Sequence, residues 1–167
     1  MKYMKERENS YEPAELLPLS AKTIEQISRH SEHTFPEECC GVIFSNGPAE
    51  RVQGLTNIQN KLHALDPQTY PRTAVIAYAM DPKELEKAIG EAQAGGARLK
   101  AFYHSHPNHD AYFSDEDKAF ACPFGEPNFP GVAQIVVSVY DRKVKSFRAY
   151  AWSDSAADFI EVPVKKV

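Results

Sequence analysis

The order of apolar and polar positions predicts a chain that mixes strands with helices. Short apolar runs rich in β-branched and aromatic residues, bounded by turn residues, are typical of strands. We expect strands at residues 40–44, 51–56, 74–78, 133–140, 144–152 and 159–164, and another that includes residues 100–103 and leads into His104. The first two would form a hairpin, and so would the strands that flank Asp141 and Arg142.

Three segments instead have the three-to-four residue spacing of a helix. Residues 20–33 begin at Ser20, a residue that caps helices well. The clearest helix begins after Asp81, which pairs with Glu84 as a capping box and has Pro82 at the first helical position. Its apolar stripe consists of Leu85, Ala88, Ile89 and Ala92. A short helix is predicted at 115–121.

The remaining segments are predicted to be irregular. Residues 1–15 are polar and without period, so we expect a flexible N-terminal tail ahead of one domain at 16–167. Residues 57–73 form a long surface connection, and residues 123–131 a proline-rich loop. The whole pattern indicates a mixed α/β fold, with a mainly antiparallel sheet and a few helices packed against it.

Composition narrows the class of protein. A chain of 167 residues that is 43% hydrophobic can bury one good core. With 19 Lys and Arg against 23 Asp and Glu, the formal charge is −4, which gives no electrostatic basis for binding nucleic acid or a membrane surface. No apolar segment approaches the roughly 20 residues that span a bilayer. Three cysteines, Cys39, Cys40 and Cys122, argue against a disulfide framework and favour the cytoplasm.

His104 and His106 are the first candidates for chemistry. The two histidines are two residues apart on a strand, so their side chains project to the same face. Their backbone positions are roughly 6.5–7 Å apart, which allows the two side chains to converge on one metal ion. A histidine pair of this kind is weak evidence by itself, since histidines are also ordinary residues of strands. The chemistry therefore depends on what accompanies the pair.

Ser114 and Asp117 follow the histidines in the sequence, and Asp117 could supply a third ligand. Their spacing is that of an ordinary helix cap, which is the simplest interpretation. The same helix start would also bring the Asp117 carboxylate close to a metal held by the strand. Three protein ligands leave the fourth tetrahedral position of zinc open to water, which is typical of a catalytic site.

These residues, with a glutamate far upstream, resemble the signature of the JAMM (MPN+) zinc isopeptidases, in their bacterial stand-alone branch. That signature is His-x-His-Pro, seven residues counting the proline, then Ser-x-x-Asp, and all of it is present at 104–117. The upstream element Pro-x-Glu-x-x-Gly matches 36–41, where Glu38 is the match and Glu37 the neighbouring alternative. Phage-tail relatives carry a second, cysteine-peptidase domain, for which this chain leaves no room.

The resemblance implies a curved, mainly antiparallel MPN/JAB-type sheet flanked by helices, with layering like that of cytidine deaminases. It also implies one Zn²⁺ per chain, held by His104, His106 and Asp117. Glu38 would be the general base that activates water, and Ser114 would help to hold the tetrahedral intermediate. The implied reaction is hydrolysis of the peptide or isopeptide bond after the tail of a ubiquitin-like or ThiS/MoaD-like protein. We expect 57–73 and 123–131 to line the groove for that tail.

Two alternatives were weighed against this hydrolase. A non-catalytic MPN-type interaction module would have lost signature residues, yet none of the five positions is missing here. A nucleobase deaminase also pairs a glutamate with zinc, but requires His-x-Glu and Pro-Cys-x-x-Cys, and the chain has neither. His109 and Asp110 are predicted to contact solvent or substrate, and Cys39 and Cys40 to be small buried residues.

Overall fold

The computed structural model describes residues 10–167, so most of the predicted N-terminal tail lies outside the described residues. Residues 10–15 form no helix or strand. They run along the turn at 153–155, where the main chain of Tyr11 is bonded to Asp154. The carboxylate of Glu12 accepts hydrogen bonds from Ser153 Oγ and the Ser155 N–H, both at 2.7 Å.

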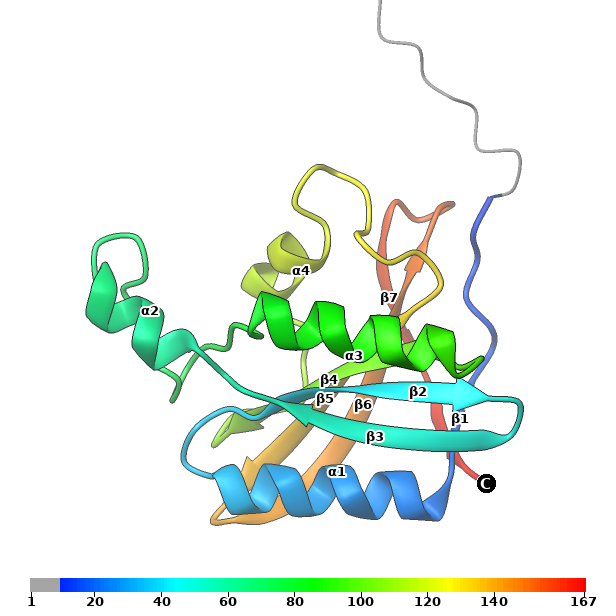
Figure 1. Ribbon diagram of the computed structural model, residues 1–167, viewed down its shortest axis with the longest axis horizontal. Coiled ribbons are helices and arrows are strands. Elements are labelled where there is room, and N and C mark those ends of the chain that lie inside the picture. Colours follow the sequence, from blue (N-terminus) through cyan, green and yellow to red (C-terminus); the bar gives the residue numbers. More distant parts are fainter. Residues whose placement is uncertain (1–9) are drawn as a thin grey trace, which may run out of the picture.

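One six-stranded sheet forms the centre of the molecule (Figure 1). Its strand order is β3-β2-β4-β5-β6-β7, and every neighbouring pair is antiparallel except β4 with β5. The bounds are β2 Cys40–Asn46, β3 Ala49–Leu55, β4 Arg98–Pro107, β5 Ala133–Tyr140, β6 Lys143–Ser153 and β7 Asp158–Val162. A separate parallel pair joins β1 Leu17–Leu19 to β8 Val164–Lys166.

Helices cover both faces of this sheet. The bounds are α1 Ala21–Thr34, α2 Gln59–Leu65, α3 Pro82–Ala94 and α4 Asp115–Ala121. Helix α1 lies on one face, α3 and α4 lie on the other, and α2 projects away from the sheet (Figure 1). Because side chains alternate along a strand, β2 and β4 each contribute to two cores, one under α1 and one under α3, while Val136 of β5 joins a third core next to α4. The predicted mixed α/β fold is confirmed.

The helices predicted to follow Ser20 and Asp81 begin at these capping residues. Ser20 Oγ accepts the Thr23 N–H at 3.1 Å, and Asp81 Oδ1 accepts the main-chain N–H groups of Lys83 and Glu84. The capping box at Asp81 is only half formed, however. The Glu84 carboxylate bonds the N–H of Thr56 at 3.2 Å, which lies outside the helix.

Two predictions for residues 57–78 are wrong. The connection at 57–73 contains a helix, α2, whose start has no side-chain cap and whose sequence has little apolar periodicity. The strand predicted at 74–78 is a series of turns in which Val75 and Ile76 are exposed. Its backbone groups are bonded by other partners: Asn60 Oδ1 accepts the Ala74 N–H, and the Ala74 carbonyl accepts the Glu38 N–H.

The predicted final strand, 159–164, is also wrong in its extent. It is divided at Pro163 into β7, an edge strand of the main sheet, and β8, which pairs with β1 instead. Proline has no N–H to donate to a ladder, so a strand ends there readily. No helix formed by residues 10–167 combines the length and apolar composition that a membrane crossing requires.

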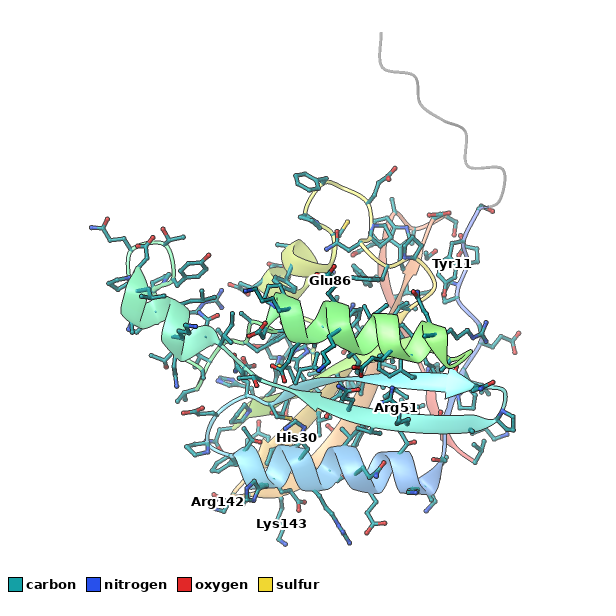
Figure 2. All side chains as sticks on the ribbon, in the orientation of Figure 1. Tyr11, His30, Arg51, Glu86, Arg142 and Lys143 are labelled. Atoms are coloured by element: carbon teal, nitrogen blue, oxygen red, sulfur yellow. The ribbon has the colours of Figure 1, made fainter. Side chains whose placement is uncertain are left out.

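A close contact between Tyr103 and Gly41 joins the neighbouring strands β4 and β2. The Tyr103 ring lies over the Gly41 backbone, and its hydroxyl shares a hydrogen bond of 2.7 Å with His30 Nδ1. Figure 2 shows His30 between α1 and the sheet, where it is half-buried. A Cβ at position 41 would lie 2.4 Å from the Tyr103 ring. Only glycine leaves room for this ring.

Gly41→Ala should therefore destabilise the fold by about 1–3 kcal/mol, because the held ring cannot move away without loss of packing. The matched control is Gly90→Ala in α3, where nothing lies within 4 Å of the new Cβ. That change should stabilise the protein by about 0.5–1 kcal/mol, since alanine favours a helix more than glycine does. Urea unfolding of the two variants measures both effects, and equal shifts would contradict the packing argument.

An ion pair and hydrogen bonds of Glu50 hold the start of α1 against the sheet. The Glu50 side chain, 6% exposed, is paired with Lys100 and accepts hydrogen bonds from the Ser20 N–H and Thr23 Oγ1. Burial acts to raise the pKa of this carboxyl, but the bonds from Lys100, Ser20 and Thr23 outweigh it and lower the pKa. Glu50 therefore stabilises the fold in its ionised form.

The stability from Glu50 is fully present above the pKa of an unfolded glutamate, about 4.3, and is lost as the pH falls through the lower folded pKa. At pH 7 Glu50→Gln should lose about 1–3 kcal/mol of unfolding free energy. The difference in unfolding free energy between this variant and the wild type should disappear as the pH falls below about 4. Glu86, exposed on α3 and visible in Figure 2, is the control, and Glu86→Gln should change little. A difference in unfolding free energy that does not change with pH would show that the charge of Glu50 does not stabilise the fold.

Candidate metal centre

Strand β4 positions the two histidines of the candidate site. Side chains of Tyr103 and Ser105 point to the α1 face, so His104 and His106 both point to the other face. Both imidazoles are buried, and their Nε2 atoms lie 3.1 Å apart. The pair predicted from the two-residue spacing is thus formed by strand geometry alone.

Asp117 reaches the histidines from the first turn of α4. Its Oδ2 lies 3.3 Å from His104 Nε2 and 3.5 Å from His106 Nε2. The helix start is a complete capping box: Ser114 Oγ accepts the Asp117 N–H, and Asp117 Oδ2 accepts the Ser114 N–H, both at 3.0 Å. Burial opposes ionisation of Asp117, but His104 and the other donors outweigh it and hold its pKa far below the usual range.

Glu38 enters from the segment between α1 and β2. Its main-chain N–H donates to the Ala74 carbonyl at 2.7 Å, and its carbonyl accepts the Asn57 side-chain amide at 2.9 Å. Glu38 Oε1 lies 3.9 Å from His106 Nε2, while Oε2 is buried without a hydrogen-bond partner within residues 10–167. Burial, and then the charge of Asp117, raise the pKa of Glu38 to about 9.

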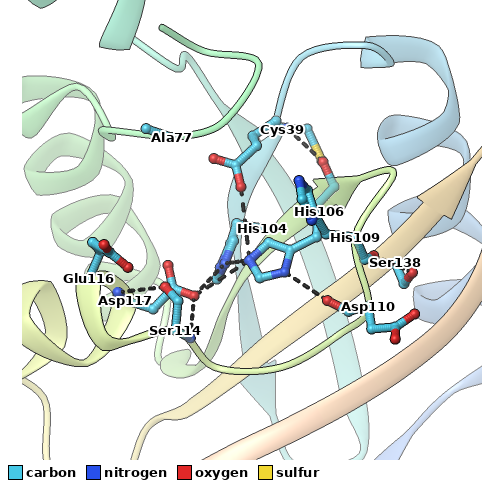
Figure 3. Close-up of polar contacts among 12 residues, drawn as sticks. Cys39, Ala77, His104, His106, His109, Asp110, Ser114, Glu116, Asp117 and Ser138 are labelled. Atoms are coloured by element: carbon cyan, nitrogen blue, oxygen red, sulfur yellow. Dashed lines mark hydrogen bonds and ion pairs between the residues drawn. The ribbon is translucent and has the colours of Figure 1, made fainter. Parts of the chain in front are cut away.

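Neighbouring groups fix the orientation of the imidazoles. His106 Nδ1 lies 2.9 Å from the Asp110 carbonyl, so Nδ1 carries the proton and Nε2 keeps a free lone pair for a metal (Figure 3). Tyr78 stacks on His104 with ring centroids 4.4 Å apart. Burial lowers the pKa of His104, which favours its neutral form. The sequence gives no sign of this role for Tyr78, because its pattern predicts a strand at 74–78.

These donors fit a tetrahedral metal ion. Figure 3 shows His104, His106 and Asp117 directed toward one another, and their donor atoms form a triangle with sides of 3.1, 3.3 and 3.5 Å. Ligands at zinc's usual bond lengths of about 2.0–2.1 Å lie about 3.3–3.4 Å apart. Glu38 with the two histidines is a second group that a metal could join, with donor atoms within 4.8 Å of one another. The shorter distances favour Asp117 as ligand and leave Glu38 beside the metal position.

A cavity of about 450 Å³ opens onto this centre. Glu38, His106, Ser114 and Asp117 lie on its wall, and part of the 57–73 connection lines it as expected. The proline-rich loop at 123–131 does not contribute to the wall of this cavity. His109 lies at the exposed rim of the cavity.

The other residues singled out from the sequence lie away from the donor atoms. Cys39 and Cys40 are buried and free, as expected of small core residues. The Asp110 side chain is exposed, where it is bonded to Lys145 and the Tyr140 hydroxyl. Glu37, the alternative to Glu38, accepts a hydrogen bond from Asn60 at 3.2 Å and does not reach the histidines.

Comparison with known proteins agrees with this geometry. Residues 20–152 match the family of prokaryotic homologues of the JAB domain. A desampylase of Haloferax volcanii is 26% identical over 153 residues, which covers 89% of this chain and 96% of the relative. The solution structure of a Desulfitobacterium hafniense protein superposes with a TM-score of 0.67 at 22% identity, covering 91% and 93% of the two chains. A JAB1/MPN domain protein from Archaeoglobus fulgidus gives 0.51 at 14% identity, covering 91% and 100%.

The unpartnered carboxyl of Glu38 should make the metal-free protein less stable. Because its pKa is raised to about 9, Glu38 must take up a proton when the metal-free protein folds near pH 7, which costs stability. Glu38→Gln needs no such proton at nearly constant volume, so the metal-free variant should gain about 1–3 kcal/mol in unfolding free energy. Glu37→Gln is the matched control, because its side chain is only half-buried and should give a change near zero. Urea unfolding in the presence of a chelator measures both. A loss of stability in Glu38→Gln would show that the carboxylate is satisfied by a partner.

Proposed function

The chain belongs to the family of prokaryotic homologues of the JAB domain, and we propose that it is a zinc metallopeptidase. Its reaction is the hydrolysis of the peptide or isopeptide bond after the C-terminal tail of a ubiquitin-like protein. One observation carries the proposal. Three atoms of the kinds that bind zinc lie within 3.5 Å of one another at an open cavity, beside a buried carboxylate oxygen with no partner within residues 10–167.

His104, His106 and Asp117 would hold the metal through the triangle of donor atoms described above. Two neutral imidazoles and one carboxylate suit zinc and leave one net positive charge on the centre. When bound, zinc lowers the pKa of water toward about 7 and polarises a carbonyl oxygen. The Asp110 carbonyl keeps the His106 lone pair aimed inward, as outer partners of metal-binding histidines commonly do.

Glu38 would serve as the general base. It faces the cavity next to the metal position, and its free Oε2 can accept a proton from the attacking water. The same carboxyl can then donate that proton to the leaving amine. A nearby divalent cation favours the ionised carboxylate, which offsets the burial that raises the pKa of Glu38.

Ser114 would stabilise the oxyanion. Its Oγ already accepts the Asp117 N–H, so its own hydrogen is available for donation toward the cavity that it lines. A donor in this position stabilises negative charge as it develops on the carbonyl oxygen.

The substrate class rests on similarity and on the shape of the cavity. The relative from Haloferax volcanii is named a desampylase, and its sequence aligns over nearly the whole chain. The cavity is open and its wall includes the irregular segment 75–79, so a peptide tail has access to the metal position. A ubiquitin-like protein, including one of the ThiS/MoaD type, therefore remains our proposed partner.

Glu38→Gln should keep about one zinc per chain and lose turnover by about 10²–10⁴-fold, because only the proton transfer is removed. Asp117→Asn should lose zinc and turnover together. Elemental analysis measures zinc, and intact-mass measurement follows cleavage of a ubiquitin fusion with a short C-terminal extension. Glu37→Gln is the control and should retain both properties. Full turnover in Glu38→Gln, or a zinc-free active wild type, would overturn the proposal.

A further inference from the structure

A second cavity, of about 200 Å³, lies beside the metal centre. It is enclosed by α3, α4, the proline-rich loop and the sheet. Its lining is mostly apolar and contains no charged residue. The main contributors are Met80, Leu85, Phe102, Phe120, Phe129 and Phe159. Such a cavity disfavours a charged ligand, because nothing in its wall would compensate the lost hydration.

One polar group in this wall lacks a partner. Gln134 lies on β5 beside Phe102 of β4 and is only 8% exposed, yet its side-chain amide bonds to no residue within 10–167. Gln59 is a useful contrast, since it is 7% exposed and donates to the Arg72 carbonyl at 2.8 Å. Asn128, the other amide of the cavity wall, donates to the Phe120 carbonyl at 3.2 Å. Within residues 10–167 the one fully buried side-chain oxygen or nitrogen without a partner is Glu38 Oε2, so the Gln134 amide is accessible from the cavity and is available to a ligand.

The second cavity adjoins the metal cavity. Tyr78 and Phe120 line both, and the Tyr78 ring contacts His104 on one side and Phe120 on the other. Phe120 and Phe129 are 57% and 38% exposed, so the second cavity opens to solvent. Exposed aromatic residues gathered at a cavity rim are typical of a binding site. A molecule bound in the metal cavity would therefore lie next to this opening.

We propose that the second cavity is a subsite for a tyrosine side chain of the protein substrate. The ring would lie among the phenylalanines, and the hydroxyl would pair with the Gln134 amide. The volume suits this occupant, because an apolar cavity of about 150 Å³ is known to take benzene. A leucine or phenylalanine would leave Gln134 without a partner, and a small polar side chain would leave the apolar space unfilled. This assignment rests on the proposed function for the origin of the tyrosine.

Side-chain analogues test the subsite directly. The zinc-loaded protein is titrated with p-cresol and with toluene, which stand for tyrosine and phenylalanine, and amide shifts are followed by NMR. We expect p-cresol to bind about tenfold more tightly, as one hydrogen bond to a buried amide allows. The shifts should centre on residues around Gln134 and Phe120. Equal affinities, or shifts centred elsewhere, would overturn the assignment.

Gln134→Leu isolates the role of the amide. This variant should weaken p-cresol binding about tenfold and leave toluene binding unchanged, since only the polar partner is removed. Gln93→Leu, at an exposed position of α3, is the control and should change neither affinity. Phe120→Ala, at an exposed position that should tolerate the change, is expected to weaken both ligands several-fold. Unchanged p-cresol affinity in Gln134→Leu would refute the proposed pairing.

Kinetics then test whether the subsite belongs to the substrate. With a ubiquitin fusion that carries tyrosine beside the cleaved bond, p-cresol should raise KM and leave kcat unchanged. An unchanged KM would overturn the substrate origin of the tyrosine. Because analogue binding needs no turnover, it is also measured in Glu38→Gln. Binding without any hydrolysis by the wild type would contradict the metallopeptidase, whereas hydrolysis without p-cresol binding would contradict the subsite.

Discussion

The burial of two carboxyl groups against two imidazoles is the constraint on which the rest of the structure depends. Glu38, His104, His106 and Asp117 are all buried, and their charges must be balanced inside the protein. Asp117 is held ionised by the imidazoles and by main-chain donation, whereas Glu38 favours its neutral form. A cation among these donors would stabilise both carboxylates at once, which explains how so polar a cluster can occupy one face of a sheet.

Several tertiary contacts keep Glu38 in this cluster although it belongs to no helix or strand. The next residue, Cys39, exchanges two hydrogen bonds with Ser105 of β4: its N–H donates to Ser105 Oγ, and its carbonyl accepts the Ser105 N–H. Asn57 bonds the Glu38 carbonyl and also the main chain of Ala77 and Ala79. Glu38, the strand with the histidines and the cavity wall are thereby fixed to one another. Such fixed groups make a site that needs little reorganisation during a reaction.

The sequence predicts those parts of the site that depend on short spacing. A two-residue period places His104 and His106 together, and a cap spacing places Ser114 beside Asp117, so both follow from local geometry. The segment at 74–78 could not be predicted in the same way, because its apolar residues are exposed and Asn57 and Asn60 replace a sheet ladder. Tyr78 and Gln134 acquire their importance only from distant neighbours. Patterns along the chain carry no information about such contacts.

Helix α4 links the stability of the fold to the chemistry of the site. Asp117 Oδ2 caps the helix through the Ser114 N–H and faces both histidines, so one oxygen serves the helix start and the metal position. A metal that binds this oxygen would order the same turn that presents the Ser114 hydroxyl. One turn further along, Phe120 forms part of both cavities. A short helix of seven residues, which would be unstable alone, thus obtains its order from the site that it helps to build.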